Sequence, residues 1–164
     1  MSNRVIENLR KAEVLSGLSD LQLSQVANIC KAARITEDRT IFSEGEEGEE
    51  LYVIHEGSVR VMINARDDRG EITPSTINTL YPGQCFGELV LLDGVLRSAT
   101  VVANEQTTLI VIRVPDFRAL CDSNPQIGYT VMRNIAQDLA YKLRSANLLL
   151  RGDIRWRGDA LGKG

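Results

Sequence analysis

The sequence contains a single histidine, His55, among 164 residues. A jelly-roll enzyme that holds a catalytic metal needs two or three histidines close together, so this count excludes that class and predicts no metal cofactor. The same scarcity leaves the serines and cysteines without a histidine that would activate a nucleophile. We therefore expect a protein that is not an enzyme.

Cysteine is also scarce. Cys30, Cys85 and Cys121 are odd in number, far apart and mostly set among apolar neighbours. Their spacing matches no zinc or redox motif, so they are interpreted as small core side chains. Three unpaired cysteines favour a reducing compartment, and we expect a cytoplasmic protein.

Long hydrophobic runs and an excess of positive charge are missing as well. The charged N-terminus argues against a signal peptide, and no segment approaches the ~18 to 20 apolar residues that a membrane span requires. Lys and Arg total 19 against 22 Asp and Glu, for a net charge of −3. No overall basic field therefore attracts nucleic acid or an acidic membrane, and a phosphate ligand would need a local site.

The middle of the chain, residues 33–114, has short apolar stretches separated by glycines and charged residues, which is typical of an all-β region. Residues 51–55 and 58–63 predict a hairpin about Glu56-Gly57. The acidic run at 44–50 is most simply a solvated loop. A polar stretch, NARDDRGEIT, is interpreted as a surface loop between strands.

Helical patterns flank the β region. Apolar spacing predicts helices over residues 5–15 and 21–30, within an N-terminal helical segment at 1–32, with Ser19 or Asp20 as the cap of the second helix. C-terminal helices are predicted over residues 115–150, and residues 151–164 are interpreted as a tail or linker.

The last helix is predicted to begin at Pro125 and to end at about Leu150. Such a helix would be ~39 Å long at 1.5 Å per residue, which exceeds what a small barrel covers. Part of its wide apolar stripe is therefore expected to contact a second copy of itself, although a helix that only caps its own barrel remains an alternative. The stripe consists of Ile127, Val131, Ile135, Leu139 and Leu143.

The most informative stretch is FGELVLLDGVLRSATVVA at 86–103. Gly87 ends a strand, the next five residues have the length of one or two helical turns, and Asp93-Gly94 indicates a turn. A short helix after a glycine offers unpaired N–H groups to an anion, and Arg97 adds a forked, permanently charged donor set. Glu88 alone also suits the helix dipole or an ion pair with Arg97, so the residues by themselves leave both interpretations open.

The run FGELVLLDGVLRSATV resembles the phosphate-binding cassette of cyclic nucleotide-binding domains, of the type found in catabolite activator proteins and in regulatory subunits of cyclic AMP-dependent kinase. The likeness continues upstream through EGEEGEELYVIHEGSVRV and downstream into the last long helix. It implies a mainly β fold with flanking helices: N-terminal helices, a β-roll or jelly-roll barrel of about eight strands, a short helix in the cassette at 86–99, and a long C-terminal helix. DNA binding is not expected, because a helix-turn-helix needs more residues than 151–164 offer.

The resemblance also implies roles for individual residues. The residue like Glu88 binds the ribose 2′-hydroxyl, and the one like Arg97 binds the cyclic phosphate. Backbone N–H groups complete the cradle, and the matching glycines Gly45 and Gly48 hold a tight turn. The expected ligand-binding set within the cassette is Phe86, Gly87, Glu88, Leu89, Arg97, Ser98 and Ala99.

The resemblance leaves the base of the cyclic nucleotide open between adenine and guanine. Ser98 stands where cyclic GMP-selective members often carry threonine and cyclic AMP binders carry alanine or serine, which favours cyclic AMP and leaves cyclic GMP open. Asn147 on the last helix can both donate and accept, which suits an adenine edge, but a solvated residue near a helix end explains it equally well.

The resemblance implies a regulatory domain in which the ligand moves the last helix, which acts as lid and homodimer contact. The output would reach a separate or covalently linked effector domain. The alternative is a ligand-free scaffold for interaction and dimerisation.

Overall fold

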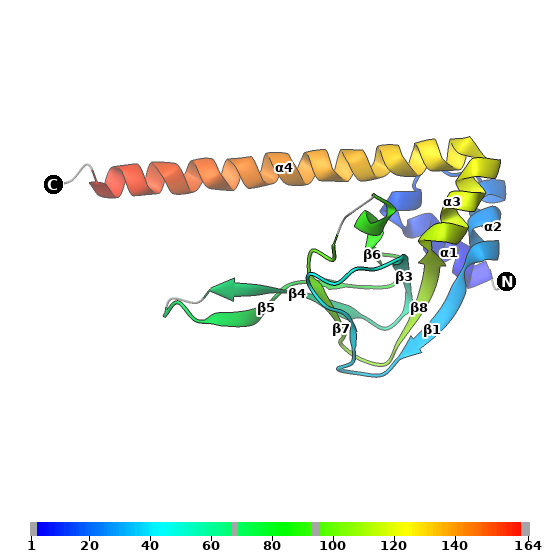
Figure 1. Cartoon of the computed structure of the whole chain (residues 1–164), viewed down its shortest axis with the longest axis horizontal. Helices are drawn as coiled ribbons and strands as arrows, with labels where there is room; N and C mark the ends of the chain where they lie inside the picture. Colours follow the sequence, from blue (N-terminus) through cyan, green and yellow to red (C-terminus); the bar gives the residue numbers. More distant parts are fainter. Residues whose placement is uncertain (1–2, 67–68, 93–95, 162–164) are drawn as a thin grey trace.

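The computed structural model describes residues 3–66, 69–92 and 96–161 (Figure 1), and the side chains as far as Leu148. Its first helices are α1 (Asn3–Lys11), the 3-10 turn η1 (Glu13–Leu15) and α2 (Asp20–Ile29). Ser19 caps α2 in a reciprocal arrangement with Gln22, because each side chain bonds the other residue's backbone N–H. The predicted cap is confirmed at Ser19.

Eight strands in the described residues form two antiparallel four-stranded sheets, which confirms the predicted jelly-roll class. One sheet has the order β1-β8-β3-β6 and the other β2-β7-β4-β5. The bounds are β1 (Lys31–Ile35), β2 (Thr40–Phe42), β3 (Glu50–Glu56), β4 (Val59–Arg66), β5 (Ile72–Leu80), β6 (Cys85–Phe86), β7 (Thr100–Ala103) and β8 (Thr107–Arg113).

The predicted hairpin about Glu56-Gly57 is wrong. Strand β3 pairs with β6 and β8, whereas β4 pairs with β5 and β7, so the short connection carries the chain from one sheet to the other. Gly57 has φ 84°, and a side chain there would stand 2.7 Å from the carbonyl oxygen of Gln106. The connection therefore packs against the loop before β8, where Thr107 Oγ1 donates to the Ser58 carbonyl at 3.0 Å.

Strand β3 is buried on both faces and separates two hydrophobic cores. Leu51 and Val53 face the core formed with the helices, whereas Tyr52 and Ile54 face the interior of the barrel. Because alternate residues of a strand point to opposite faces, this single strand contributes to both cores. The barrel interior on the Tyr52 side is where the candidate site lies.

Helices α3 (Val114–Ser123) and α4 (Pro125–Leu161) follow the barrel, and α4 continues well past it (Figure 1). The prediction that this helix ends at about Leu150 is wrong, because α4 continues to Leu161. Gly152 and Gly158 each cost about 1 kcal/mol in a helix, but no proline follows Pro125 to stop it. None of the helices in the described residues is long and apolar enough to cross a membrane.

Two predicted connections include residues outside the described ones. The Asp93-Gly94 turn lies entirely outside them. The loop predicted for 64–73 is shorter than expected, because β4 extends to Arg66 and β5 begins at Ile72.

The cysteines are all free, as expected. Burial raises the pKa of Cys30 and of Cys85 to about 12, so both remain protonated thiols at neutral pH. His55 accepts a hydrogen bond at Nδ1 from Asn8, which also donates to the His55 carbonyl and so ties α1 to β3.

Candidate ligand-binding site

The cassette begins where β6 ends. Gly87 has φ 73°, a left-handed conformation that favours glycine, and it is the N-cap of the 3-10 turn η2 (Glu88–Leu91). A side chain at Gly87 would also stand 2.6 Å from Arg97 Nη1. Glycine is therefore required here both by the backbone and by the guanidinium beside it.

Arg97 is only 6% exposed and points into the barrel. Its guanidinium carbon lies 4.0 Å from the centroid of the Phe42 ring and 5.8 Å from that of Tyr52. Phe42, Tyr52 and Phe86 contact one another with centroid distances of 5.1 to 6.0 Å. We call these three rings the aromatic box, and Arg97 lies against it.

The polar atoms of Arg97 have few partners. Nη1 donates to the Gly87 carbonyl over a long 3.4 Å, and Nε is buried with no hydrogen-bond partner in the part of the chain that the structure describes. No carboxylate among the described residues lies within ion-pair distance of Arg97. Burial lowers the pKa of Arg97, partly opposed by the negative field of nearby groups that include Glu50, but arginine stays charged at neutral pH.

The loop before β3 fixes the backbone of Arg97. The Gly45 N–H donates to the Arg97 carbonyl at 2.8 Å, and the Arg97 N–H donates to the Glu46 carbonyl at 2.9 Å. A side chain at Gly48 would stand 2.5 Å from the guanidinium carbon. Gly45, with φ 82°, thus makes the turn, whereas Gly48 makes room for Arg97.

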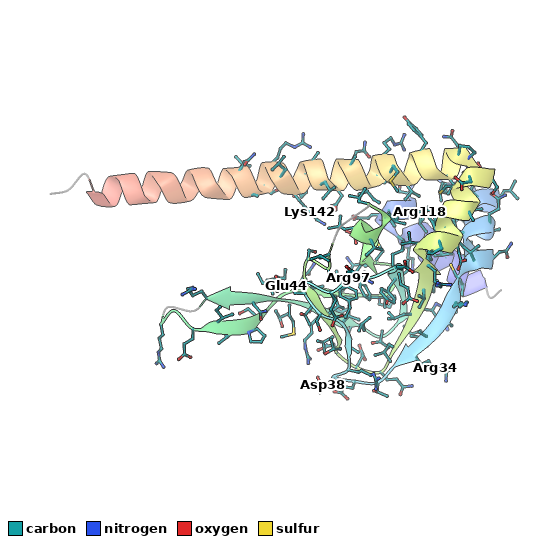
Figure 2. All side chains as sticks on the ribbon, in the orientation of Figure 1. Arg34, Asp38, Glu44, Arg97, Arg118 and Lys142 are labelled. Carbon is teal, nitrogen blue, oxygen red and sulfur yellow. The ribbon has the colours of Figure 1, made fainter. Side chains whose placement is uncertain are left out.

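Glu88 has a different partner from the one that the sequence suggested. Its side chain is 18% exposed, and Oε1 lies 4.0 Å from Nζ of Lys142 on α4, which in turn is 2.7 Å from Asp138. Burial by itself would lower the pKa of Lys142, but the hydrogen bond with Asp138 and the charge of Glu88 raise it overall. In Figure 2, Lys142 projects from the side of α4 that faces the barrel.

Glu88 and Lys142 line a cleft of about 750 Å³ between the barrel and α4, to which Asn78 and Tyr141 also contribute. Arg97 is not among its lining residues. That Glu88 and Arg97 bind one ligand stays a prediction. The two side chains contact different neighbours: Glu88 lies near Lys142 of α4, and Arg97 lies against the aromatic box.

The other predicted site residues lie around these two. Phe86 is buried in the aromatic box, and Leu89 packs on the core beside the helices. Ser98 is exposed and Ala99 is half-buried, just before β7. Asn147 is exposed on α4, beyond Ile135, the last fully buried residue of that helix among the described side chains.

Sequence reasoning missed three residues: Phe42, Tyr52 and Lys142. Nothing in the local sequence of β2 or β3 indicates that two aromatic rings meet an arginine far along the chain. Lys142 carried a weak signal, because it stands four residues after Asp138 on a predicted helix.

Comparison with known proteins identifies the family to which the chain belongs. A family model described as "Cyclic nucleotide-binding domain" matches residues 33–124. Over 87% of its length the chain is 31% identical to the Cyclic AMP receptor protein of Thermus thermophilus, and it spans 62% of that relative.

Two solved structures are also similar. The Catabolite Activator Protein of Thermus thermophilus superposes with a TM-score of 0.73 at 31% identity, over 85% of this chain and 62% of that one. The regulatory domain of Toxoplasma gondii PKA, solved with cAMP, gives a TM-score of 0.62 at 26% identity, over 71% and 43%. This chain thus spans less than two thirds of each of these proteins.

The jelly-roll barrel, the glycine-led cassette and the inward-facing arginine agree with this family match. The chain belongs to the cyclic nucleotide-binding domain family.

Proposed function

We propose that this chain is a cyclic AMP-responsive switch in which ligand bound at the cassette changes the position of α4. One observation carries the proposal: the guanidinium of Arg97 is buried, positively charged and without a carboxylate partner among the described residues, and its Nε has no acceptor. A cyclic phosphate supplies both the negative charge and the acceptor oxygens that this group lacks.

Cyclic AMP is favoured over cyclic GMP as the ligand. Serine at position 98 suits cyclic AMP, and two similar proteins are named for, or were solved with, that nucleotide. The hydroxyl of Ser98 also suits a guanine amino group, so cyclic GMP is the second candidate. Asn147, with one donor and one acceptor group, is assigned to the adenine edge.

The coupling to α4 runs through Glu88. The carboxylate of Glu88 faces Lys142 of α4 at 4.0 Å. A ribose 2′-hydroxyl that donates to Glu88 competes for this carboxylate and weakens the contact with the helix. The ligand then shifts α4 by its different affinity for the two helix positions.

We also assign homodimerisation to α4. Beyond Ile135 the apolar stripe of this helix is exposed, with Leu139 at 36% and Leu143 at 63%. An exposed apolar stripe on a helix that extends past its own barrel fits an identical helix. We place the dimer in the cytoplasm, in line with its free cysteines, and assign its output to a linked or separate effector domain, without a catalytic role of its own.

Direct titration tests the proposal. Purified protein would be melted with increasing cyclic AMP, cyclic GMP or, as the control with an open phosphate, 5′-AMP. At one hundred times its dissociation constant a ligand adds about 2.7 kcal/mol to stability, which raises the melting temperature of a domain of this size by roughly 5 to 10 °C. We expect this shift with cyclic AMP, and Arg97→Ala should abolish it.

A protein that responds to neither cyclic nucleotide at millimolar concentration would disprove the switch and leave the dimerisation scaffold as its function. Mass spectrometry of the freshly purified protein adds an independent readout, because a nucleotide retained through purification identifies the ligand directly.

A further inference from the structure

We infer that Phe42 is a positioning residue that holds the Arg97 guanidinium in the orientation needed for the ligand's phosphate. The inference rests on the proposed function, because it assigns a role at the same site to a residue outside the cassette. Phe42 lies on β2, more than fifty positions before Arg97, and contributes no polar atom.

The contact has the geometry of a cation–π interaction. The guanidinium carbon is 4.0 Å from the centroid of the Phe42 ring, well inside the ~6 Å limit for this interaction. Phe42 is itself only 8% exposed, so water does not screen the attraction. A desolvated cation–π contact is at the strong end of its range.

Backbone atoms of Gly48 and Gly87 pack closely against the guanidinium, but its polar contacts are weak. Its one hydrogen bond within the described part of the chain, from Nη1 to the Gly87 carbonyl, is long at 3.4 Å. The ring of Tyr52 is farther away at 5.8 Å, and its hydroxyl donates to Glu50 at 2.8 Å. Phe42 is therefore the nearer of the two rings that the Arg97 guanidinium contacts.

This contact is compatible with a bound phosphate. A ring above a guanidinium engages its face, whereas hydrogen bonds to phosphate oxygens use the N–H groups in its plane. The Nε of Arg97 is buried and has no partner among the described residues, so this in-plane donor is unsatisfied. Phe42 thus orders Arg97 before the ligand arrives, which reduces the entropy lost on binding.

The ring also fills the barrel core, and a purely hydrophobic role predicts a different result. If Phe42 only fills space, replacing it lowers stability without a specific effect on the ligand. If it positions Arg97, an aromatic replacement preserves affinity and an aliphatic one does not.

The experiment compares Phe42→Leu and Phe42→Tyr with Phe117→Leu. Phe117 is 2% exposed in the core beside the helices and not in the core that holds Phe42, so its replacement is a matched control for loss of buried aromatic area. Affinity for cyclic AMP would be measured by calorimetry, and folding by urea unfolding. We expect about a tenfold loss of affinity for Phe42→Leu and less than threefold for the other two.

A second measurement needs no ligand. Urea unfolding of Phe42→Leu, Arg97→Met and the double variant forms a cycle, in which the effect of Phe42→Leu should shrink once the guanidinium is absent. Additive effects, or an equal loss of affinity for Phe42→Leu and Phe117→Leu, would overturn the positioning role. Failure of the unmodified protein to bind any cyclic nucleotide would instead overturn the proposed function, and the cycle would still report on the contact.

Discussion

Replacing Arg97 with methionine should remove ligand binding while leaving the ligand-free domain about as stable as before. Methionine keeps most of the length and apolar stem of arginine but removes the charge. The buried Nε of Arg97 has no acceptor, and an unpartnered buried donor costs about 1 to 3 kcal/mol. The cation–π contact with Phe42 at 4.0 Å offsets this cost by up to about 2 kcal/mol.

These two terms nearly cancel, so we expect the free energy of unfolding of Arg97→Met to stay within about 1 kcal/mol of the wild type, or to rise. Binding responds differently. Two charge-assisted hydrogen bonds to a phosphate contribute about 1.5 to 3 kcal/mol each, so their loss reduces affinity by at least about a hundredfold.

Urea unfolding without ligand gives the first quantity, and calorimetric titration with cyclic AMP gives the second. Arg34→Met is the matched control, because Arg34 is an exposed arginine on β1, at the far end of the barrel from Arg97 in Figure 2. We expect the control to bind normally. A loss of more than about 2 kcal/mol of stability in Arg97→Met would refute the reasoning, since it would mean that the buried charge stabilises the fold.

Further variants test other parts of the site. Glu88→Gln should lower the affinity for cyclic AMP about tenfold in calorimetry but leave the affinity for the 2′-deoxy analogue unchanged, because only cyclic AMP has the 2′-hydroxyl. An equal loss of affinity for both nucleotides would contradict the ribose contact. Gly48→Ala should displace the Arg97 guanidinium, and so should lower the urea midpoint and abolish the ligand-induced rise in melting temperature. A methyl group at Gly45 meets open space, so Gly45→Ala should lower only the urea midpoint, through the strain of its positive φ. Leu143→Glu should turn a dimer into a monomer in light scattering, and an unchanged mass would remove α4 as the contact. Burial and a neighbouring carboxylate raise the pKa of Tyr52 from 10.0 to about 12. The protonated hydroxyl therefore stabilises the folded state below pH 10, and this contribution is lost as pH rises to 12. In urea unfolding measured at several pH values, Tyr52→Phe should reduce the fall in the free energy of unfolding over this range by about 2 to 3 kcal/mol.

Much of the fold follows from local signals in the sequence. Glycines and charged residues between short apolar runs indicated an all-β region, and the barrel was implied by the family resemblance. Ser19, Pro115 and Pro125 marked helix starts that the structure contains. The hairpin error shows the limit of such signals. A short loop between two apolar strands specifies that the chain turns, but which sheet receives the next strand depends on the loop packing against Thr107, far away in sequence.

The cassette shows the same division at the level of the site. The sequence by itself determined that Gly87, Glu88 and Arg97 stand in register within one segment, because these are local features of one run of residues. Only the tertiary structure decided that Arg97 lies on the ring of Phe42 and that Glu88 faces Lys142. Those partners come from β2 and α4, and only the closing of the barrel and the docking of the last helix bring them to the cassette.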